Sequence, residues 1–170
     1  MRAAKAVEAV WRERAERLSQ RPISAGPPQD AFPVLVLGIG TERYGIHLPD
    51  VVEVLPLLTP TPVPGAPAVF AGVINVHGEI RPVIDLKRFL GMETAEDGSR
   101  RLILLRQDGR ELGLQIDSVE HIRSIGAGEF EASGNGHGGS PRHIRGSTKD
   151  LLMLLSTEAL FAELLIGVTN

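Results

Sequence analysis

The chain has 170 residues, a formal net charge of −3, no cysteine and only 4% aromatic residues. This charge balance argues against nucleic-acid binding, and the lack of cysteine excludes disulfides, thiolate catalysis and thiolate-bound metals. Because no apolar run is long enough to span a membrane and no apolar signal core opens the chain, we expect a soluble, cytoplasmic protein without membrane insertion.

Residues 1–22 are predicted to form an N-terminal helical extension, which residues 23–33 link to the rest of the chain. From Ala3 to Leu18 the sequence is rich in Ala, Glu and Arg, with apolar residues at helical spacing. Pro22 ends this helix, and the Pro and Gly content that follows predicts a flexible linker. Trp11 lies on a narrow apolar stripe. The helix either docks on a partner through Trp11 or folds back on its own domain, and the sequence favours neither reading.

Short strands separated by turns are predicted from Val34 onward. Residues 34–39 and 44–48 have the apolar, β-branched composition of strands and flank a turn. A third apolar run, residues 51–58, leads into a proline-punctuated loop at residues 59–67. Proline spacing in that loop excludes both a helix and an interior strand.

The stretch Gly72–Leu86 has the pattern of a β-hairpin, with two apolar runs around His77-Gly78-Glu79. The second run alternates with a period of two, so we expect one face on a core and the other at least partly wet. The core set would be Ile80, Pro82, Ile84 and Leu86, and the wetter set Arg81, Val83 and Asp85. Since proline has no N–H, the amide side of Pro82 is predicted to be an edge or a bulge. A short helical turn follows at residues 86–91.

The second half of the chain continues with strands. Residues 102–122 read as a strand, an Asp-Gly turn, a second strand and a further apolar run. Residues 130–143 are predicted to be a mobile loop because they are rich in Gly and Ser. Residues 151–156 are predicted as a buried strand, and residues 157–165 as a closing helix with Thr157 as its N-cap. The apolar face of that helix would carry Leu160, Phe161, Leu164 and Leu165.

The order of apolar residues in the first half is repeated in the second. Tyr44-Gly45-Ile46 aligns with Leu112-Gly113-Leu114, and Gly72 aligns with Gly146. Further aligned pairs are Val51 with Val119, Val54 with Ile122, Ile80 with Leu151, and Val83 with Leu154. The repeat predicts a mainly β fold in which two small, similar β-barrels pack pseudo-symmetrically and share a core.

No set of residues matches the pattern of a catalytic or metal site. His77, Glu79 and Asp85 do not have the compact spacing of metal ligands, and His137 and His143 fall in the glycine-rich loop. Ser147 and Thr148 follow a glycine but lack a nucleophile elbow. Glu53 and Asp85 form a carboxylate pair only if the fold brings them together. The sequence therefore favours a binding module without a metal or cofactor.

Several motifs occur together in one order between Glu53 and Gly91. They are Glu53-Val54, Pro64 and Pro67, the run Gly72-Val73-Ile74-Asn75-Val76-His77-Gly78, and Pro82-Val83-Ile84-Asp85-Leu86. This set resembles the signature of the CheW family, the adaptor domain of bacterial chemotaxis arrays. Residues 44–54 and 112–122 resemble two further family motifs. The resemblance covers Val34 to Leu165.

This resemblance implies a fold of two five-stranded, SH3-like β-barrels around a shared core, within a CheW-like domain at residues 34–166. The barrels would occupy roughly residues 34–91, with strand exchange, and residues 100–156. It also implies a non-enzymatic scaffold of a two-component system that bridges chemoreceptor tips (methyl-accepting chemotaxis proteins) and the regulatory domain of the histidine kinase CheA. We expect a monomer or weak self-association. The implied receptor-binding residues, in the groove between the barrels, are Val51, Glu53, Gly72, Asn75, His77 and Gly78.

The chain departs from the family pattern at three places. The family has Arg where this chain has His77, and an imidazole is shorter than a guanidinium and charged only when protonated. The family often has Leu-Asp before the closing helix, where this chain has Leu155-Ser156. The N-terminal helix with Trp11 is an extension. These departures suggest a divergent adaptor, for example of a non-motility chemosensory pathway.

Two other function classes are weighed against the adaptor. One is a small-ligand-sensing barrel with the glycine-rich loop as its lid, which ligand-induced thermal stabilisation would reveal. The other is a hydrolase that uses Glu53, Asp85 or His77. The absence of a recognisable catalytic set makes the adaptor the preferred hypothesis.

Overall fold

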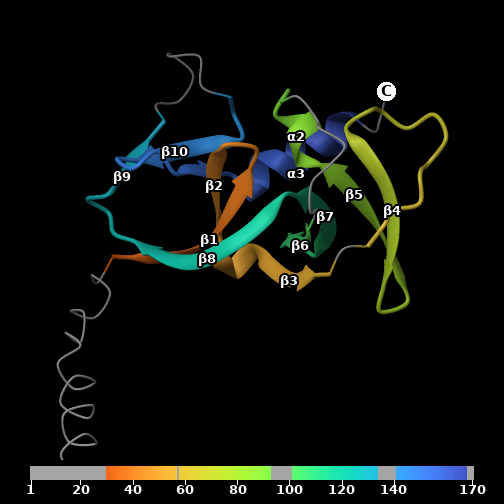
Figure 1. The fold of residues 1–170 in the computed structure, drawn as a ribbon, viewed down its shortest axis with the longest axis horizontal. Helices are drawn as coiled ribbons and strands as arrows, with labels where there is room; N and C mark the ends of the chain where they lie inside the picture. Colours follow the sequence, from red (N-terminus) through yellow and green to blue (C-terminus); the bar gives the residue numbers. More distant parts are fainter. Residues whose placement is uncertain (1–29, 57, 93–100, 134–140, 168–170) are drawn as a thin grey trace, which may run out of the picture. The chain divides into compact units, whose positions relative to one another are not determined.

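The computed structural model describes residues 30–56, 58–92, 101–133 and 141–167. Within them the chain is mainly β, as predicted, with two short helices and one 3-10 turn (Figure 1). The elements are β1 Phe32–Ile39, β2 Glu42–His47, η1 Leu48–Asp50, β3 Val51–Leu55, β4 Phe70–Val76, β5 Glu79–Asp85, α2 Leu86–Phe89, β6 Arg101–Gln107, β7 Arg110–Ile116, β8 Ser118–Ile125, β9 Phe130–Ala132, β10 Ile144–Thr148, β11 Met153–Leu155 and α3 Thr157–Gly167.

The predicted N-terminal helix, Trp11 and most of the predicted linker lie outside the described residues, as do residues 93–100 and 134–140. The first strand starts at Phe32, two residues before the predicted boundary. Among the described residues, no helix has the length and apolar character needed to cross a membrane.

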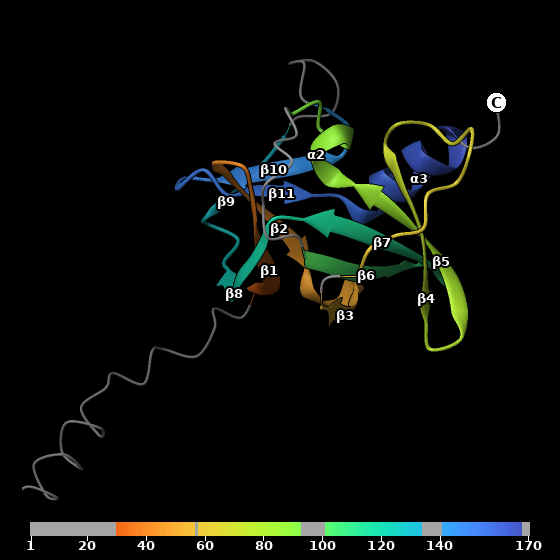
Figure 2. The ribbon, with the colours of Figure 1, turned by 45° about the vertical axis from the view of Figure 1, so that its right-hand side comes forward.

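The strands form two sheets, here called sheet A and sheet B. Sheet A has the order β8-β1-β2-β11-β10-β9, and sheet B has the order β3-β6-β7-β5-β4 (Figures 1 and 2). Sheet A has six strands and not the expected five, because β9 pairs with β10 over residues 130–132. The predicted loop at residues 130–143 is therefore partly a strand, since Phe130 packs against the core of sheet A.

Each sheet takes strands from both halves of the chain. After the β1–β2 hairpin the chain crosses from sheet A to sheet B, where β3 pairs with β6. After the β6–β7 hairpin the chain crosses back to sheet A, where β8 pairs with β1. The rough division into residues 34–91, with strand exchange, and 100–156 is thus crossed twice, by β3 and by β8. Sheet B combines β3, β4 and β5 with β6 and β7.

The predicted shared core is present between the sheets. Alternate residues of β1 point into different clusters: Leu35 and Leu37 into the shared core, Val34 and Val36 into the interior of sheet A. In β6, Ile103 and Leu105 join the shared core, whereas Leu102 and Leu104 fill sheet B. Because both faces of these strands are buried, their sequences are continuously apolar. Side chains of α3 close the shared core.

The repeated glycines mark one parallel strand pair in each sheet. In sheet A, β2 pairs with β11 at Gly45 and Leu154, and in sheet B, β7 pairs with β5 at Gly113 and Val83. A Cβ at Gly45 would lie 2.6 Å from Leu154 Cδ2, and one at Gly113 would lie 3.1 Å from Val83 Cγ2. Each glycine therefore makes room for the side chain of the parallel strand, which explains why the repeat preserves it.

The predicted alternation along β5 is wrong at both of its ends. Ile80, expected in the core, is 62% exposed, whereas Val83 and Asp85, expected on the wetter face, are buried. The β7 strand covers β5 only from Val83 to Asp85, so the end of β5 near the turn projects beyond the sheet. A period-two pattern assumes that one face of the strand is exposed to solvent along its whole length. In β5 both faces are buried from Val83 to Asp85. Pro82 lies one residue before the β7 pairing begins.

Two predictions near the C-terminus also need correction. Leu151, expected in a buried strand, is 80% exposed with φ 64°, because β11 starts only at Met153. Thr157 starts α3, but the N-cap is Ser156, whose Oγ accepts a hydrogen bond from Ala159 N at 3.2 Å. Asp85 caps α2 in the same way by accepting from Arg88 N. Ser156 therefore caps α3 as Asp85 caps α2.

Candidate functional site

Four of the six predicted receptor-binding residues are exposed or half-exposed around one hairpin turn. Glu53 lies on β3, Asn75 on β4, and His77 and Gly78 form the turn between β4 and β5. We call the exposed residues 77–80 the hairpin tip. In Figures 1 and 2 the hairpin of β4 and β5 projects from the body of sheet B.

The turn has the geometry expected of a two-residue hairpin loop. His77 and Gly78 both have positive φ, 51° and 89°, as a type I′ turn requires. The amide of Gly78 donates to Asn75 Oδ1 at 2.9 Å, which ties the turn to the end of β4. The imidazole of His77 is thus presented outward by the backbone, and 78% of its side chain is exposed.

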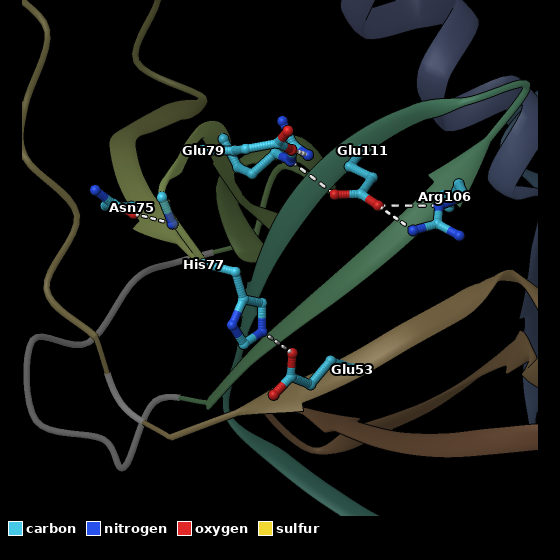
Figure 3. A network of polar contacts seen from close by, with 8 residues as sticks. Glu53, Asn75, His77, Glu79, Arg106 and Glu111 are labelled. Atoms are coloured by element: carbon cyan, nitrogen blue, oxygen red, sulfur yellow. Dashed lines mark hydrogen bonds and ion pairs between the residues drawn. The ribbon is translucent and has the colours of Figure 1, made fainter.

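The two edge strands of sheet B are linked at this turn by a side-chain contact. Although β3 and β4 are the two edge strands of the sheet, His77 Nε2 lies 3.0 Å from Glu53 Oε2 (Figure 3). Leu55 of β3 shares a hydrophobic cluster with Ile74 and Val76 of β4, so the two edges also meet below the surface. Two of the six residues predicted to contact a partner therefore contact each other.

The other two predicted residues are less accessible. Val51 is half-buried and packs against the shared core. Gly72 is buried with φ 138°, and a Cβ there would lie 2.3 Å from the carbonyl oxygen of Thr61. The backbone that approaches Gly72 is that of Thr61, which forms a bridge with Val73.

A network of four charged side chains lies beside the turn, and the sequence analysis did not identify it. Arg81 Nε donates to Glu111 Oε2 at 2.7 Å and pairs with Glu79 through Nη2 (Figure 3). Arg106 Nε donates to Glu111 Oε1 at 2.9 Å. Hydrogen bonds from Arg106 and Arg81 hold the pKa of Glu111 below its usual range. The Arg106–Glu111 pair follows from the Asp-Gly hairpin register, whereas the Arg81 contact depends on the parallel pairing of β5 and β7.

The equivalent position in sheet A has a different ion pair. Arg123 of β8 contacts Asp150, which lies in the turn between β10 and β11, at 2.5 Å. Arg123 also contacts Glu129 at 2.8 Å, and Thr148 Oγ1 donates to Asp150 Oδ1 at 2.6 Å. The hydrogen bond from Arg123 lowers the pKa of Asp150 to about 2. An edge strand is therefore joined to a hairpin turn in both sheets, by an arginine–aspartate pair in sheet A and by a histidine–glutamate pair in sheet B.

The remaining candidates for catalysis or metal binding make contacts within the fold. Asp85 is buried and caps α2, so it is not a free partner for Glu53 in acid–base chemistry. His143 is nearly buried, with its ring against Phe89 and Nδ1 3.5 Å from Glu163 Oε2. Within the described part of the chain, no three metal-ligating side chains form a group. What remains exposed at the turn is the surface of residues 77–80.

Comparisons with known proteins identify one family. The family model of the CheW-like domain matches residues 33–165. A probable chemotaxis protein CheW from Rhizobium etli is 31% identical over 136 residues, which cover 76% of this chain and 87% of that protein. Protein FrzA from Myxococcus xanthus is 31% identical over 123 residues, covering 72% of this chain and 75% of that protein. The crystal structure of the scaffolding protein TtCheW from Thermoanaerobacter tengcongensis aligns with a TM-score of 0.66 and 28% identity, covering 73% of this chain and 86% of that chain.

Proposed function

Because the chain belongs to the family of CheW-like domains, we propose that it is a chemotaxis-type adaptor that couples chemoreceptors to the histidine kinase CheA. We propose further that it acts in the cytoplasm and has no catalytic activity of its own. The observation that supports this role best is the hairpin tip. It is exposed, it is fixed by the chain's own contacts, and it lies within the motif that resembles the family's receptor-binding signature.

The receptor surface in this proposal consists of Glu53, Asn75, His77 and Gly78. Glu53 offers a hydrogen-bond acceptor, and the adjacent imidazole of His77 offers a donor or an acceptor, depending on its tautomer. Gly78 has no side chain, which leaves the turn open to a partner backbone. Val51 and Gly72 act indirectly, since one packs on the core and the other on Thr61. Such a polar surface suits the charged and amide side chains of a helical receptor tip.

His77 is the specific observation that favours a divergent adaptor within this role. It stands where the family has Arg, and its imidazole pairs with Glu53 only at an exposed surface. An exposed pair of this kind contributes about 0–1 kcal/mol to stability. A partner group can therefore replace His77 as the contact of Glu53 at little cost in free energy.

The proposal is tested with the purified chain, receptor-tip fragments and the CheA regulatory domain encoded in the same genome. We expect the unaltered chain to bind both. Binding to neither at tens of micromolar would contradict the adaptor role.

The Glu53→Lys substitution is expected to weaken receptor binding about fivefold or more, because it reverses the charge at the centre of the surface. The melting temperature should change little, since 42% of the Glu53 side chain is exposed. Isothermal titration calorimetry and thermal unfolding measure the two effects. Glu131→Lys, at an exposed position of β9, is the matched charge reversal and should leave receptor binding unchanged.

A further inference from the structure

The hairpin tip lacks backbone support on the side of β7. The β4–β5 pairing continues to Val76 and Glu79, but β5 and β7 pair only over Val83–Asp85. Ile80 is 62% exposed, which agrees with a strand end that no neighbour covers. Contacts other than the sheet ladder must therefore fix the direction of the tip on this side.

Arg81 supplies this contact at the first half-buried position after the tip. Its guanidinium reaches back to Glu79 within the tip and across to Glu111 of β7. By continuing the β5–β7 register, Arg81 lies opposite Glu111 two residues before the pairing starts at Val83 and Gly113. The Arg81–Glu111 ion pair thus links β5 to β7 where the two strands have no backbone pairing.

Glu111 is itself held in place. Its second carboxylate oxygen accepts from Arg106 on β6, so the carboxylate is clamped between two guanidinium groups (Figure 3). Only 11% of the Glu111 side chain and 24% of the Arg81 side chain are exposed. Both values are much lower than those of the Glu53–His77 pair on the other side of the tip. Because the Arg81–Glu111 pair is better shielded from water, it holds its geometry more strongly.

We propose that Glu111 is a positioning residue for receptor recognition, which acts by holding Arg81 and, through Arg81 and Glu79, the hairpin tip. This inference rests on the proposed adaptor function. Glu111 does not contact the receptor. It fixes the tip, so that a partner meets His77 and Gly78 already in their binding arrangement and loses less conformational entropy on docking.

The test compares Glu111→Gln, Arg81→Gln and the double variant with the unaltered chain. We expect each single variant to weaken binding of the receptor-tip fragment about fivefold, and the double variant to weaken it no more than one single variant. Asp117→Asn is the matched control. It breaks the Lys87–Asp117 ion pair, which is of similar exposure but lies away from the tip, and it should leave the affinity unchanged.

Backbone ¹⁵N relaxation provides a readout that a general loss of stability would not reproduce. In Glu111→Gln, order parameters should fall at residues 77–80 and stay unchanged in β6 and β7. Unchanged affinity in both single variants, additive losses in the double variant, or unaltered order parameters at the tip would each overturn the inference. Failure of the unaltered chain to bind receptor would instead overturn the proposed function, while the relaxation data would still decide whether Glu111 orders the tip.

Discussion

At the scale of single residues, His77 combines two requirements that conflict. The turn needs a residue at φ 51°, and the contact with Glu53 needs a long polar side chain. Histidine tolerates positive φ better than most residues with side chains, and it reaches Glu53. Arginine would strain the turn more but would carry a permanent charge and a bidentate fork.

The His77→Arg substitution is therefore expected to strengthen receptor binding, by about twofold to fivefold, if the surface is used as in the family. Calorimetric titration with the receptor-tip fragment measures the effect. His77→Asn is the control, since Asn-Gly is a favoured type I′ turn, and it removes the imidazole without disturbing the backbone. Unchanged or weaker binding of His77→Arg would indicate that this surface serves another partner.

The sequence identified the residues of the turn, but not the distances between them. The hairpin pattern located the turn at His77 and Gly78, whereas Asn75 and Glu53 entered only through the family resemblance. That Glu53 contacts His77 depends on the meeting of two edge strands that are distant in sequence, which periodicity does not report. The backbone of Thr61 approaches Gly72 closely, and nothing in the sequence indicated this intramolecular contact.

At the scale of elements, the hairpins were the most predictable part. The turns His77-Gly78 and Asp108-Gly109 both have two positive φ values, as their sequences suggest. Burial along the strands was harder to predict. Ile80, expected in the core, is exposed, and Val83, expected on the wetter face, is buried, because β7 pairs with β5 only at one end. The repeating pattern within one strand does not show where a neighbouring strand covers it.

The β10–β11 turn provides a prediction for acid conditions. The hydrogen bond from Arg123 lowers the pKa of Asp150 from its usual 3.8 to about 2. An aspartate with a lowered pKa in the folded state stabilises the fold above its unfolded-state pKa, and this contribution is lost as the pH falls through the folded-state value. The unaltered chain should therefore lose stability more steeply than Asp150→Asn between about pH 4 and pH 2.

Urea unfolding at successive pH values measures this difference. The two proteins should differ most near neutral pH, and their unfolding midpoints should converge near pH 2. Added salt should reduce the difference, since the ion pair lies at the surface. A constant difference at all pH values would mean that Asp150 stabilises the turn only through hydrogen bonds that do not depend on its charge.

At the scale of the whole molecule, the repeat predicted two related units with a shared core, and the structure has both. The repeat did not predict which strands form each sheet, because the pairing of β3 with β6 and of β8 with β1 is decided by distant contacts. The shared core contains Leu35 and Ile46 of sheet A together with Ile103 and Leu114 of sheet B. Neither sheet can unfold without exposing apolar surface of the other.

A mutation inside one sheet should consequently destabilise both. Gly45→Ala places a Cβ 2.6 Å from Leu154 in sheet A, and Gly113→Ala places one 3.1 Å from Val83 in sheet B. We expect Gly45→Ala to cost about 1–3 kcal/mol and Gly113→Ala less, because overpacking costs rise as the new contact shortens. Differential scanning calorimetry should show one transition for residues 32–170 in both variants, at a lower temperature than in the unaltered chain. Two separate transitions in either variant would mean that the sheets fold independently of each other.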